Sequence, residues 1–541
     1  MSDSAVVDNE SSFSAHVRSV VERFLQTVVL VDDLASFSTE EEIGPLDEPT
    51  PETAVQSAVE ESGDAPSRPK EPLDAKSLVE AFGRRGLVCS VLRPTRDDVS
   101  GEEINEFFQS FLAASAAADV VVLDWVIHDD QGSAAISLLK ELIERDQQGG
   151  RGRLRLVAIY TGEPDLTHIF DRLSTELESS VEESSNDSEK GIWIRCGGLH
   201  VSVLAKEGVH VDAEFNELRV SVENLPFRIV QEFTRLTHGL IPAFALSCLA
   251  IVREDAHYLL KRFNSRLDAP FLTHRIYTSD DDAQDFAVHL LASELKALLD
   301  ASEASKELRA EVIELWLDER LASSPHVSGG DGSPSHQQIR DLVRKGFEDG
   351  RPEGMKKSVT SVTGLFCDST EVPEDLDHEF GRLSCLARNY PEPYPRARPP
   401  LLTIGTVIAR QRSEDWEYFL CVQPACDAVR LTDITQFAFL PLREHSQSFD
   451  IVALGPNNAK LYLKLAVGVR DLLLTDFQPS DGKVRATQSE LGYQFNDSNS
   501  DSYVWVGQLR DFQAQRHASQ ISGEIGRPGG DDYEWLRRSA R

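Results

Sequence analysis

Short apolar runs alternate with amphipathic segments along the first part of the chain. The apolar runs are rich in valine and leucine and end in polar residues, a pattern typical of buried parallel strands. Between them, apolar residues recur at the three- and four-residue spacing of a helix that buries one face. Strands that alternate with helices predict an α/β fold with a doubly wound, five-stranded parallel sheet. The predicted strands span residues 27–31, 87–92, 118–123, 154–160 and 199–204.

Two polar stretches interrupt this pattern. Residues 36–72 are acidic, rich in proline, serine and glutamate, and show no sustained periodicity. Residues 178–190 are also strongly polar. Segments of this composition bury too little apolar surface to fold, so we predict two disordered insertions. With them, the first domain spans residues 1–220.

Three further parts are predicted beyond residue 220. Apolar residues at helical spacing indicate a helical domain over 221–325, and a Gly-Ser stretch and a polar helical segment follow over 326–400. From residue 401 to 541 the pattern changes to short strands, and 403–409 with 418–422 reads as a hairpin pair. We therefore predict a β-rich C-terminal domain.

Composition narrows the possible partners. The formal net charge is −35, which disfavours binding to nucleic acids or anionic membranes, because both are polyanions. The seven cysteines lack paired metal-ligand spacing, and no apolar run reaches the ~18 residues of a membrane helix. We expect a soluble cytoplasmic protein without disulfides, and no nucleic-acid or membrane partner.

Chemistry-bearing residues follow the predicted strands. Asp32 and Asp33 come after the first strand, Asp124 after the third, Thr161 after the fourth and Lys206 after the fifth. The carboxyl ends of parallel strands are where such folds bind ligands. Three carboxylates brought together there need a cation, and an all-oxygen set selects a hard one such as Mg²⁺. With the metal bound, one carboxylate becomes a nucleophile towards a phosphoryl group.

This order of groups resembles the receiver domain of two-component response regulators, over about residues 27–208. The resemblance implies a CheY- or flavodoxin-like fold, with Asp124 as the phospho-acceptor. It also implies that Asp32, Asp33, Asp124 and the backbone carbonyl of Val126 hold Mg²⁺.

The same resemblance gives roles to two more residues. Thr161 is expected to hydrogen-bond a phosphoryl oxygen, and Lys206 to pair with the phosphate. Two positions depart from the usual receiver pattern: Glu207 stands where receivers usually have proline, and Val203 replaces the aromatic residue that commonly reports phosphorylation. A receiver without that aromatic residue is not expected to transmit its signal in the ordinary way.

Purely structural interpretations of the single residues remain open. An acidic pair after a strand is often a solvated turn, and a strand-terminal aspartate is often a helix N-cap. His128 stands beside two acidic residues and could be a metal ligand, but a solvated loop is favoured. His238 on a predicted helix is favoured as a structural histidine. The order of the five strand-end residues outweighs these separate readings.

Residues 267–275, Leu-Asp-Ala-Pro-Phe-Leu-Thr-His-Arg, lie in the helical part. A receiver followed by such a segment resembles the "response receiver" proteins of bacterial anti-phage systems, in particular the receiver proteins without an effector domain in the Detocs phage-defence system. That resemblance implies a sensor histidine kinase as partner, a second receiver-containing effector in the same system, and a role as a phosphate sink.

Two alternatives stay open. The first is a receiver-regulated enzyme or effector whose activity lies in residues 391–541, although no nucleophile–base pair, Walker loop or zinc constellation stands out there. The second is a structural adaptor with an inactive receiver.

Overall fold

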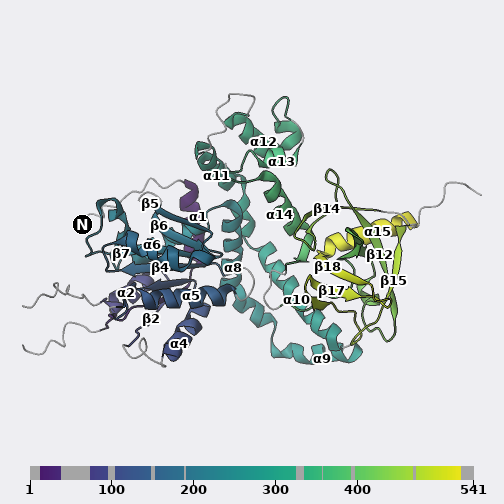
Figure 1. Cartoon of the computed structure of the whole chain (residues 1–541), viewed down its shortest axis with the longest axis horizontal. Helices are drawn as coiled ribbons and strands as arrows, with labels where there is room; N and C mark the ends of the chain where they lie inside the picture. The colour runs from purple at the N-terminus through teal and green to yellow at the C-terminus, as the bar shows by residue number, and fades with distance from the viewer. Residues whose placement is uncertain are drawn as a thin grey trace, which may run out of the picture. The chain divides into compact units, whose positions relative to one another are not determined.

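The computed structural model describes residues 12–37, 73–95, 104–128, 130–147, 153–187, 191–278, 280–323, 334–355, 358–368, 370–391, 397–466 and 471–525. The chain divides into two compact units (Figure 1). The first comprises Met1–Ile276 and Asp280–Ala322, and the second comprises Tyr277–Ser279 and Ser323–Arg541.

A largely parallel sheet forms the centre of the first unit. Five parallel strands lie in the order β2-β1-β3-β4-β7, so the predicted parallel sheet is confirmed. Each strand except β2 is buried almost throughout, because helices cover both faces. The strands are β1 (Thr27–Val31), β2 (Val88–Leu92), β3 (Val120–Leu123), β4 (Arg155–Thr161) and β7 (Leu199–Lys206).

The predicted total of five strands was wrong, because the described residues form a sheet of eight strands that contains these five. Strand β6 (Gly191–Cys196) runs antiparallel to β7, β5 (Glu183–Asp187) runs antiparallel to β6, and the short β8 (Arg219–Val220) pairs with β7. Strand β5 falls in the stretch expected to be disordered, after a 3-10 turn (Glu178–Ser180). Its sequence is polar because it lies at the edge of the sheet with both faces largely exposed. Hydrogen bonds to β6, rather than apolar burial, hold it in place.

Successive residues of each parallel strand face two separate cores. Val120 and Val122 of β3 pack on one side, and Val121 and Leu123 pack on the other. The first side is covered by α1 (Ser12–Phe24), α2 (Ala75–Arg84) and α7 (Leu225–Leu236). The second is covered by α4 (Ile104–Ala117), α5 (Ser133–Gln147) and α6 (Leu166–Glu176), with a 3-10 turn at Ala213–Leu218.

The two ends of the first predicted insertion meet. Ser36 and Asp74 form an isolated parallel bridge, and the side chain of Asp74 caps α2 by accepting a hydrogen bond from the backbone N–H of Ser77. Residues 38–72 lie outside the described ranges. The described residues on the two sides of the insertion therefore lie next to each other.

Helices complete the first unit. They are α8 (Leu240–Arg262), α9 (Asp268–Tyr277), α10 (Asp280–Ala301) and α11 (Ala310–Ser323), joined by 3-10 turns at Ser265–Leu267 and Ala304–Leu308. The first half of α8 packs against α1 through Ala243, Leu246 and Ala250, which are buried in the same core as α1. No helix within the described ranges is both long enough and apolar enough to cross a membrane.

The second unit joins helices to an antiparallel sheet. Within the described ranges this sheet has ten strands, in the order β13-β14-β12-β11-β10-β18-β17-β16, with β15 on β12 and β9 on β18. A separate β-rich sheet at the C-terminal end is therefore confirmed. The helices are α12 (His336–Gly350), α13 (Val359–Thr363), α14 (Pro373–Cys385) and α15 (Asp511–Ile525).

The ten strands enclose two buried apolar clusters, one of them rich in phenylalanine. The expected hairpin over 403–409 and 418–422 corresponds to β10 and β11, which pair antiparallel. The strands are β9 (Leu386–Asn389), β10 (Thr406–Arg412), β11 (Asp415–Cys421), β12 (Thr435–Glu444), β13 (Ile451–Leu454), β14 (Lys460–Leu465), β15 (Leu473–Phe477), β16 (Thr487–Ser489), β17 (Gly492–Asn496) and β18 (Ser502–Leu509).

Candidate functional site

The carboxyl edge of the parallel sheet carries the predicted site residues. Val31 of β1 lies in register with Leu123 of β3, so the residues that follow them, Asp32 and Asp124, leave neighbouring strands side by side. The backbone N–H of Asp124 donates to the carbonyl of Val31 (2.9 Å), which continues the ladder to the end of the strand. Strand order thus places the two carboxylates at one point of the edge.

Three carboxylates and one ammonium meet there. Asp32, Asp33 and Asp124 are all buried, and one carboxylate oxygen from each lies within 4.8 Å of the others. Lys206, the last residue of β7, places its Nζ 2.9 Å from Asp32 Oδ2 and 3.0 Å from Asp124 Oδ2. The lysine therefore bridges two of the three carboxylates, although its strand lies two places away from β3 in the sheet.

Asp33 has a second neighbour that the sequence did not indicate. The backbone N–H of His128 donates to Asp33 Oδ2 (3.0 Å), and His128 Nδ1 lies 3.0 Å from the same oxygen. His128 Nε2 lies 3.0 Å from the carbonyl oxygen of Pro94. His128 is thus half-buried against Asp33, and the favoured reading of a solvated loop was wrong. The position of His128, four residues after Asp124, was the nearest signal in the sequence, and it does not by itself predict this contact.

The pKa of Asp124 reflects first its burial and then the charges around it. Burial is the main cause that raises the pKa of Asp124 to about 7; Lys206 opposes the shift, and the charges of Asp32 and Asp33 add to it. For Lys206 burial alone would lower the pKa, but the charges of Asp124 and Asp32 outweigh burial and the pKa is raised. The ammonium thus stays charged, while Asp124 binds a proton near neutral pH.

The loop that carries Val126 is fixed by local contacts. Trp125 is buried against Gly132, where an added Cβ would come 2.3 Å from the Trp125 ring, and Gly132 has a φ of 93°. Asp130 Oδ1 accepts hydrogen bonds from the backbone N–H groups of Ile127 and Gly132, at 3.0 Å each. These contacts hold Val126 in an ordered loop two residues after Asp124.

Thr161 ends β4, the strand next to β3, and is buried. Its Oγ1 accepts a hydrogen bond from the backbone N–H of Glu163 (3.0 Å). Because the hydroxyl oxygen is the acceptor in this contact, its proton remains a donor for another group. The side chain thus offers a hydrogen-bond donor at the end of the strand next to β3, which Asp124 follows.

The donor set fits a hard divalent cation. Asp33 Oδ1 is buried and has no hydrogen-bond partner among the described residues, although a buried carboxylate oxygen without a partner is costly. Three carboxylates face the single ammonium of Lys206, so the cluster retains an excess of negative charge. Oxygen ligands with this charge suit Mg²⁺. Receiver domains typically bind Mg²⁺ at such an acidic cluster.

A comparison with known families identifies this part of the chain. Residues 24–211 match the family model described as "Response receiver domain". The chain therefore contains a response receiver domain, which indicates a phospho-accepting role in signalling. No curated protein and no solved structure matches the chain. The likeness of the whole chain to the effector-less receiver proteins of Detocs stays a prediction.

Proposed function

We propose that this protein accepts a phosphoryl group on Asp124 from the phosphohistidine of a sensor kinase. The observation that carries the proposal is the cluster of Asp32, Asp33, Asp124 and Lys206 at the carboxyl edge of a receiver sheet. Asp32 and Asp33 are the proposed Mg²⁺ ligands, together with Asp124 and the carbonyl of Val126. The bound ion supplies positive charge for the phosphoryl oxygens during transfer.

The chain's own residues would perform the remaining steps. An Oδ atom of Asp124 attacks the phosphorus, the P–N bond of the donor breaks, and the imidazole leaves with the bonding electron pair. The Lys206 ammonium lies 3.0 Å from Asp124 and favours the charged form of its carboxylate, which is the nucleophile. After transfer the same ammonium pairs with a phosphoryl oxygen, and the Thr161 hydroxyl donates to another.

The finer role that we propose is a phosphate sink in phage-defence signalling. In this role the protein takes phosphate from the sensor kinase before it reaches a second receiver-containing effector. Two features support a receiver that does not switch in the ordinary way. Val203 is buried where the reporting aromatic residue would stand, and the Tyr160 hydroxyl donates to the carbonyl of Val220 (2.8 Å) within the core. A phosphate acceptor without a mobile aromatic residue suits storage better than transmission.

Phosphate uptake is tested with acetyl phosphate and intact-mass measurement. The wild type is expected to gain one phosphoryl group with Mg²⁺ and none without it. Asp124→Asn should gain none, because the amide cannot attack the phosphorus. The matched control is Asp171→Asn on α6, which is exposed and should be labelled like the wild type. Equal labelling of Asp124→Asn would overturn the proposal.

The sink role has a separate test. A phosphorylated sensor kinase is mixed with a second receiver, with wild type or Asp124→Asn present. The wild type should lower the phosphate that reaches the second receiver, and Asp124→Asn should leave it unchanged. If the wild type takes up phosphate but does not lower that amount, the sink role is wrong while the phospho-acceptor role stands.

A further inference from the structure

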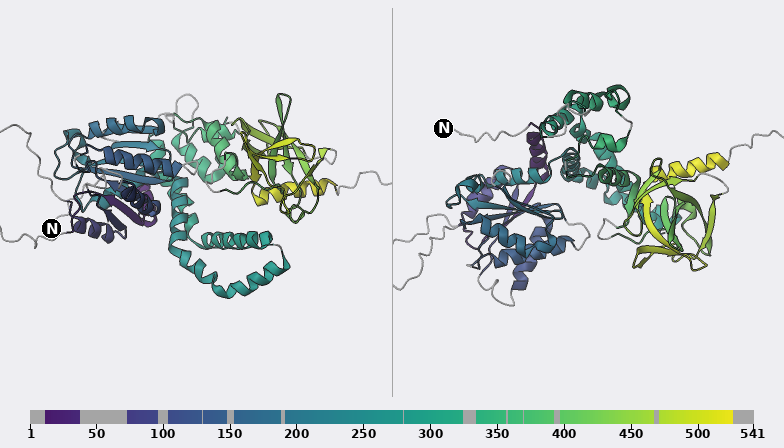
Figure 2. Two further views of the ribbon diagram at one scale, coloured as in Figure 1. Left: turned by 60° about the horizontal axis from the view of Figure 1, so that its bottom comes forward. Right: turned by 45° about the horizontal axis from the view of Figure 1, so that its top comes forward.

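His128 lies where the residues that follow three strands meet. Asp33, Pro94 and His128 come after β1, β2 and β3, which are adjacent in the receiver sheet. Figure 2 shows helices on both sides of this sheet, so the residues that follow its strands lie at its edges. His128 Nδ1 lies 3.0 Å from Asp33 Oδ2, and Nε2 lies 3.0 Å from the carbonyl oxygen of Pro94. Both ring nitrogens thus face a protein oxygen, and the ring is not itself a metal ligand in this arrangement.

The backbone of His128 contacts the same carboxylate oxygen as its ring. The His128 N–H donates to Asp33 Oδ2 (3.0 Å), the oxygen that Nδ1 also faces. His128 makes both contacts from a left-handed conformation, with a φ of 53°. This conformation is uncommon for residues with a side chain and is energetically costly, and such strain clusters at functional sites. A functional role of the two contacts with Asp33 explains why the costly conformation is present here.

Other contacts fix both sides of this interaction. Arg93 Nε donates to the carbonyl oxygen of Asp33 (2.9 Å), which holds the main chain of the aspartate. Ile127, directly before His128, donates its backbone N–H to Asp130 Oδ1 (3.0 Å). The carboxylate and the residue that contacts it are therefore each held by the chain.

These contacts give the two oxygens of Asp33 different surroundings. Oδ2 has two contacts with His128, whereas Oδ1 is buried and has no hydrogen-bond partner among the described residues. A carboxylate held in this way offers one oxygen to a cation, not both. Mg²⁺ demands near-ideal octahedral geometry, for which the two oxygens of one carboxylate lie too close together, whereas Ca²⁺ accepts both oxygens of one carboxylate. A single available oxygen therefore suits Mg²⁺ better than Ca²⁺.

We propose that His128 is a positioning residue that makes Asp33 a one-oxygen ligand, so that the site prefers Mg²⁺ to Ca²⁺. This inference rests on the proposed function, in which Asp33 is a Mg²⁺ ligand. His128 engages Oδ2 and leaves Oδ1 for the cation. Lys206 engages one oxygen of Asp124 in a similar way, because its Nζ lies 3.0 Å from Asp124 Oδ2.

Cation binding to the full-length protein tests the proposal. Isothermal titration calorimetry measures the dissociation constants of Mg²⁺ and Ca²⁺ for the wild type and for His128→Gly, with Asp33→Asn as the reference for cations bound at other carboxylates. Glycine accepts the left-handed conformation, so this substitution removes the ring without adding backbone strain. Mg²⁺ binding should weaken about 10- to 100-fold, the usual cost of losing the outer partner of a metal ligand. Ca²⁺ binding should weaken less, because Oδ2 loses its contact with the ring and can bind the larger ion.

Two further variants separate positioning from a structural role. His128→Asn keeps a side chain that tolerates the left-handed conformation and can donate a hydrogen bond to Asp33, so it should restore most of the Mg²⁺ affinity and the preference for Mg²⁺. His289→Ala on α10 replaces an exposed histidine and should bind both cations like the wild type. A purely structural role of His128 would weaken the binding of both cations by the same factor.

The outcomes distinguish this inference from the proposed function. Unchanged Mg²⁺ binding by His128→Gly, or equal weakening of Mg²⁺ and Ca²⁺ binding, would overturn the positioning role. The phospho-acceptor role would still stand if the wild type gains a phosphoryl group from acetyl phosphate. A wild type that binds no Mg²⁺ and gains no phosphoryl group would overturn both.

Discussion

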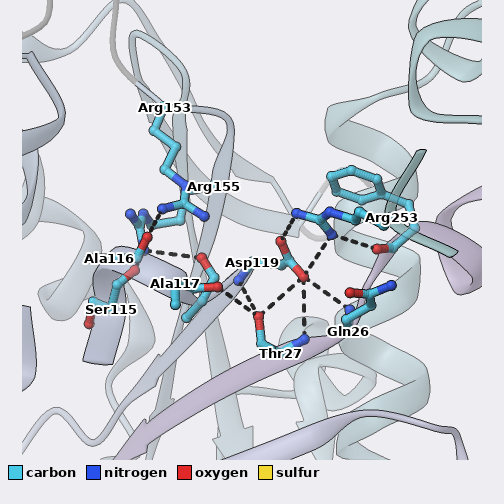
Figure 3. A network of polar contacts seen from close by, with 11 residues as sticks. Gln26, Thr27, Ser115, Ala116, Ala117, Asp119, Arg153, Arg155 and Arg253 are labelled. Atoms are coloured by element: carbon cyan, nitrogen blue, oxygen red, sulfur yellow. Dashed lines mark hydrogen bonds and ion pairs between the residues drawn. The ribbon is translucent and has the colours of Figure 1, made fainter. Parts of the chain in front are cut away.

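Asp119 and Asp124 lie at the two ends of β3, and both are buried, with 3 % and 6 % of their surface exposed. Asp119 accepts hydrogen bonds from two backbone N–H groups and forms a two-pronged ion pair with Arg253 (Figure 3). Asp124 shares Lys206 with Asp32, and two further carboxylates lie beside it. The same residue type on the same strand thus has its charge balanced at one end and left in excess at the other.

The two edges differ in how their buried charges are compensated. At the amino edge, anions and cations match: Asp119 has Arg253, and the buried Arg155 donates to Asp146 (3.0 Å). At the carboxyl edge, three carboxylates lie together, Lys206 pairs with two of them, and Asp33 Oδ1 has no hydrogen-bond partner among the described residues. Removing one partner of a buried ion pair leaves an uncompensated charge in the core, whereas a cluster with excess negative charge is relieved when it binds a cation.

The largest expected change in stability is at the amino end of β3, where Arg253 balances the charge of Asp119. Arg253→Met should lower the free energy of unfolding by about 3 kcal/mol, because it leaves the Asp119 carboxylate buried without its cation. Urea denaturation of the full chain measures this change. The neighbouring exposed pair supplies the control: Glu254→Gln breaks the Arg23–Glu254 ion pair and should cost less than about 1 kcal/mol. Equal costs for the two variants would contradict the contrast between the ends of β3.

Neutralising the two aspartates should change stability in opposite directions. Asp119→Asn should destabilise the protein by about 2 kcal/mol, because Arg253 then loses its anion. Asp124→Asn should stabilise the Mg²⁺-free protein by about 1–2 kcal/mol at pH 8, because the pKa of Asp124 is raised to about 7 and its ionised form is unfavourable. Thermal unfolding of both variants with a chelator present measures whether each substitution raises or lowers the stability. Destabilisation by both substitutions would show that the charge of Asp124 is also compensated within the fold.

A smaller effect on stability is expected from His200, a buried histidine of β7. Burial lowers the pKa of His200 to about 4, with Arg195 and Arg235 adding to the shift, and its ring stacks on Trp193. The unfolded chain therefore binds a proton between pH 6.5 and 4 that the folded chain does not, so stability falls as the pH falls through this window. The loss should reach about 1–2 kcal/mol from pH 7 to pH 5. His200→Phe keeps a stacked ring and should remove this part of the pH dependence; an unchanged slope would show that His200 is protonated in the fold.

The sequence predicted the parallel strands, because apolar residues dominate each of them. Apolar runs located the parallel strands, and the residues directly after them, such as Asp32 and Lys206, identified the edge where a ligand could bind. Strand β5 was missed because its sequence is polar and its stability comes from pairing with β6. Alternation of Ile192 and Ile194 with Trp193 was a signal for β6 that a search for continuous apolar runs does not detect.

The balanced end of β3 could not be predicted. Asp119 and Arg253 are 134 residues apart, and no local pattern connects a strand in one region with a helix in another. The contact of His128 with Asp33 depends on a left-handed residue in the loop, with a φ of 53°, and that conformation is also set by tertiary packing. Pairings between distant residues decide which charges are balanced, and they emerge only in the folded chain.

The location of the phosphoryl group tests the central claim most directly. The full-length protein is treated with acetyl phosphate and Mg²⁺, reduced with borohydride to convert an aspartyl phosphate to homoserine, and mapped by tandem mass spectrometry. The excess of charge at the carboxyl edge predicts modification at Asp124 and an unmodified Asp119. Modification at Asp119, or at neither aspartate, would contradict the account.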